Sequence, residues 1–167
     1  MLYGFNKGSH KMITQSQLKN LFYYKLGNLY WKERVNSAVN LDKPAGCKSL
    51  DARAIRINKK LYLEHRLVFL FHHGFLPAKI DHKDGNRSNN SICNLRECTS
   101  AQNSWNSKTP INNTSGVKGV AWNSKNNSWR VRLKCNGKTV EIGSFNDINE
   151  AEKAVKKARE ALHKEFA

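Results

Sequence analysis

Two short apolar segments, each the length of a β-strand, lie on either side of a long polar loop that is rich in asparagine. The segments cover residues 79–82 and 95–99, and the loop covers 83–94. Thr99, followed three residues later by Gln102, forms a capping-box signature and predicts a helix over 100–108. The local architecture is therefore expected to be strand, long loop, strand and helix.

The chain before this stretch is predicted to be a mixture of short helices and hairpins. Thr14 and Gln17 form another capping box, and Gly74 is placed to end a buried apolar helix. The predicted elements are a helix over 15–22, a hairpin over 23–31, irregular chain over 33–48, a hairpin over 52–63 and a helix that contains 65–71.

The residues after position 115 are predicted to form a three-stranded antiparallel sheet packed on one C-terminal helix. Strand-like segments cover 119–122, 128–135 and 138–145, and Asn-Gly at 136–137 is a strong tight-turn signal. An apolar stripe follows a capping-box signature at Asp147 and predicts a long helix. The proline-containing segment 109–115 lacks periodicity and is typical of a linker. We therefore expect an α+β chain with domains at 1–108, whose core motif is 79–108, and at 116–167.

The charge balance favours a polyanionic partner. The 167 residues include 29 Lys and Arg against 13 Asp and Glu, a formal charge of +16. Such an excess favours nucleic acid, whose binding is driven by counterion release, although a cationic membrane-surface protein is the rival interpretation. No stretch approaches the roughly 20 apolar residues that span a bilayer, and no secretory signal is visible. The four cysteines include no CxxC pair, which gives no support to structural zinc.

Asp81, His82 and Asn103 together have the side chains that phosphodiester hydrolysis requires. The reaction needs a base to activate water and a cation to neutralise the phosphate. Adjacent strand residues point to opposite sides, so Asp81 and His82 can serve the cation and the water separately. An oxygen-rich ligand set with open positions suits Mg²⁺. The alternative is an asparagine-rich loop whose side chains only satisfy turn backbones.

This stretch resembles the HNH endonuclease motif, or ββα-metal fold, in its phage and intron-encoded branch. The likeness covers about 17–108 and includes YWKERV at 30–35, EHRLV at 64–68, IDH at 80–82, DGN at 84–86, NN at 89–90, NLRECT at 94–99 and SAQN at 100–103. The resemblance implies that His82 is the general base and that Asp81 and Asn103 are ligands of Mg²⁺ or another divalent cation such as Mn²⁺. It also implies that Asn94 ties the catalytic loop together.

Two further arginines and a row of cations are candidate DNA contacts. Arg66 and Arg96 can contact phosphate or be ordinary surface charges, and His65 can either touch the site or be a packed group. Alternation along the strand predicts that Trp129, Val131 and Leu133 face the helix. The opposite face then carries Arg130, Arg132 and Lys134, either as a DNA-reading surface or as a solvated one.

The C-terminal residues resemble the plant Apetala-two or ethylene-response-factor DNA-binding domain. The matching motifs are GVAW at 119–122, WRVRL at 129–133, IGSF at 142–145 and EAEKAV at 150–155. The resemblance adds Lys118 and Thr139 to the DNA-facing set. Glu141 and Ala121 depart from that family's pattern, so its target sequence is not expected here.

These observations predict a Mg²⁺-dependent endonuclease that hydrolyses duplex DNA in a bacterial or phage-infected cytoplasm. One metal site per chain predicts nicking by a monomer, and double-strand cleavage would need a dimer on DNA. The alternatives are a non-catalytic DNA-binding regulator on the same scaffold and an RNA-binding protein that uses the same basic face.

Overall fold

The computed structural model describes residues 12–49 and 52–166, and these form two compact units. The first unit contains the described residues up to Leu76 together with Asn90–Ile92. The second contains Pro77–Asn89 and the chain from Cys93 onward. Helices and small antiparallel sheets alternate in both units, so the expected α+β class is confirmed.

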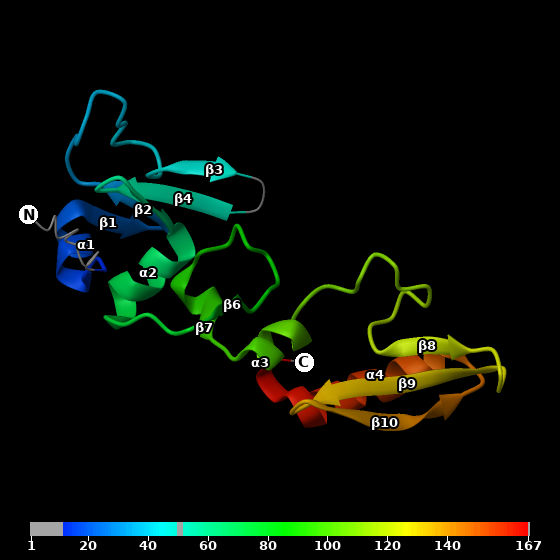
Figure 1. The fold of residues 1–167 in the computed structure, drawn as a ribbon. Coiled ribbons are helices and arrows are strands. Elements are labelled where there is room, and N and C mark those ends of the chain that lie inside the picture. The colour runs from blue at the N-terminus through cyan, green and yellow to red at the C-terminus, as the bar shows by residue number, and fades with distance from the viewer. Residues whose placement is uncertain (1–11, 50–51, 167) are drawn as a thin grey trace, which may run out of the picture. The chain divides into compact units, whose positions relative to one another are not determined.

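The first unit combines two helices with a two-stranded and a three-stranded sheet (Figure 1). All strand pairs are antiparallel, and the three-stranded sheet has the order β3-β4-β5. The elements are α1 (Gln15–Leu21), β1 (Phe22–Lys25), β2 (Asn28–Trp31), β3 (Cys47–Ser49), β4 (Ala52–Ile57), β5 (Lys60–Leu63) and α2 (Glu64–His73).

Local sequence signals explain most of this unit. The Thr14 and Gln17 side chains make both reciprocal hydrogen bonds of the predicted capping box. Gly74 ends α2 in the left-handed conformation, with φ of 78°. The second hairpin turns at Asn58 and Lys59, both of which have positive φ. The segment expected to be irregular ends in the short edge strand β3. The sequence did not predict this strand, because three residues are too few to show an alternating pattern.

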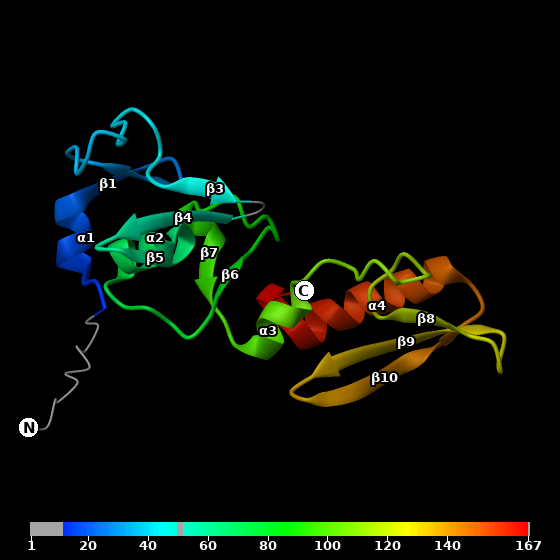
Figure 2. The ribbon, with the colours of Figure 1, turned by 45° about the horizontal axis from the view of Figure 1, so that its top comes forward.

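The second unit begins with the predicted strand, loop, strand and helix. These are β6 (Ile80–His82), the loop with the short 3-10 helix η1 (Ile92–Asn94), β7 (Leu95–Glu97) and α3 (Ser100–Trp105). The two strands pair antiparallel and lead into α3 (Figure 2). The Thr99 capping box is present, but α3 ends at Trp105 instead of continuing to 108.

The C-terminal part of this unit is a three-stranded antiparallel sheet of order β10-β9-β8 with one helix packed on it (Figure 1). Its core consists of Val120, Val131, Leu133, Ala151 and Val155. The predicted tight turn has positive φ at both Asn136 and Gly137. The elements are β8 (Val120–Asn123), β9 (Ser128–Cys135), β10 (Lys138–Phe145), α4 (Ile148–His163) and the 3-10 helix η2 (Lys164–Phe166).

The expected capping box at the start of α4 is only partly formed. Asp147 caps α4 by accepting a hydrogen bond from the Asn149 backbone, instead of forming the expected box with Glu150. The expected linker 109–115 lies inside the second unit, where Arg159 also donates a hydrogen bond to the Trp105 carbonyl. The division into domains at 1–108 and 116–167 stays a prediction. Within the described ranges, every helix is too short or too polar to cross a membrane.

Candidate functional site

Asp81 and His82 end strand β6 and are both buried. Antiparallel pairing places Asp81 opposite Arg96 and His82 opposite Leu95. The exposed fractions are only 6% for Asp81 and 7% for His82. Burial of a carboxylate is costly unless it is paired and hydrogen-bonded, so the partners of Asp81 decide what this site can do.

The Asp81 carboxylate is held by one guanidinium and one amide. Arg96 donates from Nε to Oδ2 at 2.9 Å, and its Nη2 lies 2.8 Å from the same oxygen. Asn106, the C-cap of α3, donates from Nδ2 toward Oδ1 at 3.1 Å and Oδ2 at 3.0 Å. The same amide group lies 2.7 Å from the His82 carbonyl oxygen. Asn106 therefore joins the end of α3 to the two residues expected to carry the chemistry.

The amide that reaches Asp81 comes from Asn106, whereas Asn103 was the expected partner. Asn103 is half-buried in the first turns of α3, and its backbone N–H donates to the Thr99 carbonyl. Asn106 follows Asn103 by three residues, the spacing that places side chains on one face of a helix. The metal-ligand role of Asn103 stays a prediction, and Asn106 is the residue that sequence reasoning missed.

Asn94 links the two sides of the long loop. Its Nδ2 donates to Asp84 Oδ1 at 2.9 Å and to the Asn89 carbonyl at 2.8 Å. Its Oδ1 accepts from the Asp84 backbone N–H at 3.1 Å. Desolvation raises the pKa of Asp84, but hydrogen bonds from Asn89, Asn86 and Asn94 outweigh it, so the pKa lies below its usual value. The buried Asn94 side chain thus cross-links the loop at Asp84 and Asn89 and is called the clasp below.

A fully buried glutamate in the first unit binds the loop from outside the motif. Glu64 accepts from the Leu29 backbone N–H at 3.0 Å and from Asn90 Nδ2 at 2.9 Å, and Arg53 Nε lies 3.6 Å away. Desolvation raises the pKa of Glu64 despite these partners. Sequence reasoning did not single out this residue, although an acid that immediately precedes an apolar helix was a visible signal. Arg66 and His65 are half-buried neighbours in the first turn of α2.

The three predicted cations of β9 lie on the side of the sheet away from the core. Arg132 and Lys134 are exposed and Arg130 is half-buried, whereas Val131 and Leu133 are buried as expected. Strand pairing sets Thr139 opposite Lys134 and Glu141 opposite Arg132, so the face is basic with one acidic interruption.

Lys118 and Arg96 have intramolecular partners that the expected DNA-binding set did not anticipate. Lys118 Nζ donates to the Ser104 and Trp105 carbonyl oxygens, each at 2.9 Å, at the end of α3. Burial lowers the pKa of Lys118. Its ammonium therefore stabilises the negative end of the short helix. The DNA-binding roles of Lys118 and Arg96 stay predictions.

The donor chemistry at Asp81 suits a hard divalent cation, but its present partners are cationic or neutral donors. Mg²⁺ keeps several waters and needs only one or two carboxylate or amide oxygens from a protein, and the Asp81 carboxylate is a ligand of this kind. Among residues 12–49 and 52–166, no three His, Cys, Asp or Glu side chains form a metal-binding group. A cation at Asp81 would therefore bind through few protein ligands and in exchange for hydrogen bonds from Arg96 or Asn106.

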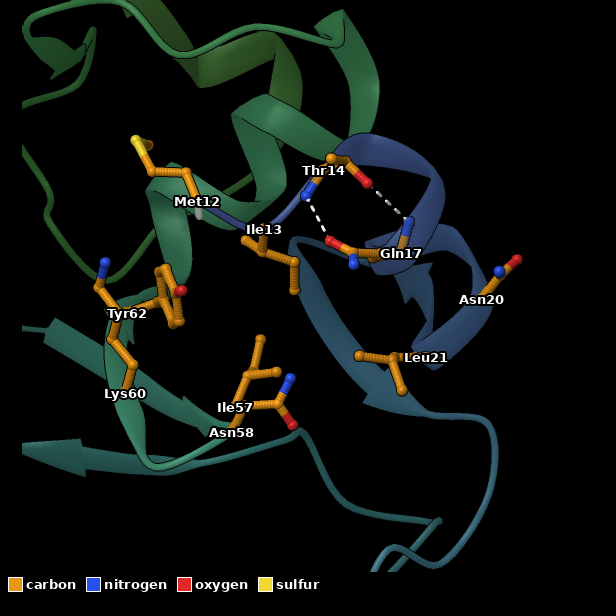
Figure 3. Close-up of a pocket in the computed structure, with 10 residues that line it drawn as sticks. All are labelled: Met12, Ile13, Thr14, Gln17, Asn20, Leu21, Ile57, Asn58, Lys60 and Tyr62. Carbon is orange, nitrogen blue, oxygen red and sulfur yellow. Dashed lines mark hydrogen bonds between the residues drawn. The ribbon is translucent and has the colours of Figure 1, made fainter. Parts of the chain in front are cut away.

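One cavity of the first unit is lined by residues without such chemistry. A cavity of about 460 Å³ lies between α1 and the β4–β5 hairpin, where Figure 3 shows Ile13 and Leu21 facing Ile57. Its other lining residues include Tyr62 and Lys60 and none of the expected catalytic side chains.

Comparison with known proteins identifies one family match and two relatives. Residues 62–105 match the HNH endonuclease family. Protein 3.8 of Escherichia phage T7 is 41% identical over 88 residues, which are 53% of this chain and 72% of that protein. An uncharacterized HNH endonuclease of Acanthamoeba polyphaga mimivirus is 37% identical over 106 residues, which are 62% of this chain and 54% of that relative.

The family match covers the nuclease motif, and the comparisons give no support to the resemblance of the C-terminal part to the Apetala-two domain. No solved structure matches the chain. The high identity to Protein 3.8 over most of its length shows common descent. The chain therefore belongs to the same protein family as Protein 3.8 of phage T7 and carries an HNH endonuclease domain.

Proposed function

We propose that the protein is a divalent-metal-dependent endonuclease that nicks duplex DNA. The observation that carries the proposal is the pairing of β6 with β7, followed by α3, within the residues that match HNH endonucleases; this arrangement sets Asp81 beside His82, and the amide of Asn106 contacts both. We place its work in the cytoplasm of a phage-infected bacterium because the matched relative is a phage protein.

In this proposal His82 takes a proton from the attacking water. The water oxygen forms a bond to phosphorus while the bond from phosphorus to the 3′-oxygen breaks. The 5′-phosphate remains on one product, and the 3′-oxygen takes up a proton from solvent water and becomes a hydroxyl. Asp81 and Asn103 would hold a Mg²⁺ or Mn²⁺ ion, whose positive charge would stabilise the pentacoordinate phosphate and the departing oxygen. Asn94 keeps the loop closed so that His82 and Asp81 hold their places.

Supercoiled plasmid provides the direct test. Wild-type protein with Mg²⁺ should convert closed circles to nicked circles, and EDTA or His82→Ala should abolish the conversion. His73→Ala is the matched control, because His73 is an exposed histidine on α2 in the first unit. Plasmid that stays closed with wild-type protein under Mg²⁺, Mn²⁺ and every site sequence tried would contradict an endonuclease.

The basic face of β9 is proposed to bind the DNA backbone. Replacing Arg132 and Lys134 with Ala should reduce the slope of log K against log salt by about 1.8, since each phosphate contact contributes about 0.9. Lys156 and Lys157 on the exposed side of α4 give a control double variant with the same change in net charge. Equal salt slopes in both double variants would contradict the proposal that the β9 face binds the DNA backbone.

The second candidate is a non-catalytic DNA-binding regulator. It is favoured by one observation, namely that Arg96 and Asn106 already satisfy both oxygens of Asp81. The plasmid assay separates the two candidates, because a regulator binds the plasmid and leaves it closed with every metal.

A further inference from the structure

Arg96 is anchored on two opposite sides. One edge of its guanidinium holds Asp81 at 2.8 to 2.9 Å. Its Nη1 donates to the backbone carbonyl of Glu165 in η2, and its Cζ lies 3.6 Å from the centre of the Phe166 ring. Phe166 is only 3% exposed, and the Arg96 side chain is 11% exposed. A cation on an aromatic face, shielded from water, is a stabilising arrangement.

The C-terminal turn that contacts Arg96 is itself fixed to α3. The His163 ring stacks on Trp105, with ring centres 4.3 Å apart and an interplanar angle of 5°. Arg159 Nη2 donates to the Trp105 carbonyl at 3.3 Å. Both views show η2, in red, beside α3 (Figures 1 and 2), and all these residues belong to the second unit. Phe166 and Glu165 therefore have a defined place relative to β7.

The guanidinium and a divalent cation compete for the same carboxylate. Asp81 is the acid whose side chain Arg96 neutralises, and two positive charges a few ångströms apart in a buried site repel each other. Arginine also binds phosphate through the same parallel donors that it gives to a carboxylate. A DNA phosphate that binds Arg96 would remove the competing positive charge from Asp81, and only the neutral amide of Asn106 would remain on that carboxylate.

We propose that η2 holds Arg96 on Asp81 as a latch, so that the C-terminal turn lowers the affinity of the nuclease site for a divalent cation until DNA draws Arg96 away. This inference rests on the proposed function, because it takes Asp81 to be the metal ligand. Arg96 is a positioning residue in this scheme, and Phe166 acts through it.

Mn²⁺ binding in the absence of DNA tests the latch without any activity measurement. The full-length protein is titrated with Mn²⁺, and free Mn²⁺ is followed by electron paramagnetic resonance. Arg96→Gln removes the charge and should tighten Kd by about tenfold, which is equivalent to about 1.4 kcal/mol. Phe166→Leu keeps an apolar side chain but removes the ring, so Kd should tighten severalfold. Phe166→Tyr and Lys164→Ala should bind as the wild type does.

The possible failures are distinguishable. A wild type that nicks plasmid and binds Mn²⁺ with the same Kd as Arg96→Gln would refute the latch and leave the proposed function intact. A tighter Kd in Arg96→Gln with an unchanged Kd in Phe166→Leu would refute the role of the C-terminal turn. Absence of Mn²⁺ binding in the wild type and in every variant would overturn both the latch and the proposed metal site.

Discussion

Replacement of Asn94 by alanine should open the loop between the two strands of the nuclease motif. The substitution removes three hydrogen bonds, two donated by Nδ2 to Asp84 and Asn89 and one accepted from the Asp84 backbone. A hydrogen bond contributes about 1 kcal/mol net, and the partly solvated Asp84 reduces the total, so closure should weaken by about 2 to 3 kcal/mol.

Amide hydrogen exchange at the Asp84 backbone N–H measures this loss directly. That N–H is bound by Asn94 Oδ1 in the closed loop, so its exchange should accelerate by about 30-fold to 150-fold in Asn94→Ala. The control is Asn86→Ala in the same loop, because Asn86 accepts one exposed hydrogen bond from the Ser88 backbone. Its effect should stay within about 0.5 kcal/mol. Equal acceleration in both variants would show that Asn94 is not the clasp.

Three other changes probe the remaining structure. Glu64→Ala leaves two buried donors without an acceptor and should lower the free energy of unfolding by about 3 kcal/mol in denaturant titration, whereas exposed Glu33→Ala should change it little. The pKa of Asp84 is lowered on folding, so the ionised carboxylate stabilises the closed loop above the unfolded pKa, and this stabilisation is lost as pH falls through the folded pKa. Hydrogen exchange at the loop amides should show the loss of protection on acidification and not on alkalinisation. Gly46→Ala would bring a Cβ within 2.1 Å of a β4 carbonyl oxygen at φ of 76° and should lower the melting temperature far more than Gly137→Ala, where φ is 78° and no atom lies within 4 Å. Similar melting temperatures for the two glycine variants would contradict the close packing of Gly46.

The sequence by itself determined the local elements of this protein. Thr14 and Thr99 begin helices because their hydroxyl groups and the glutamines three residues later satisfy free backbone groups at a helix start. The Asn136-Gly137 turn forms because both residues tolerate positive φ. Alternation along β9 correctly separated buried Val131 and Leu133 from the cationic face. Each of these signals acts over a few residues, so each can be read without the fold.

Only the tertiary structure decided which side chains meet at the site. The motif singled out Asn103 as the second ligand beside Asp81, and the amide that contacts the Asp81 carboxylate is that of Asn106, the C-cap of α3. Arg96 was a candidate phosphate contact, but antiparallel pairing put its guanidinium on Asp81 and the C-terminal turn enclosed its other side. These contacts join residues far apart in the chain, and their partners are chosen by strand register and helix packing, which no short stretch of sequence encodes.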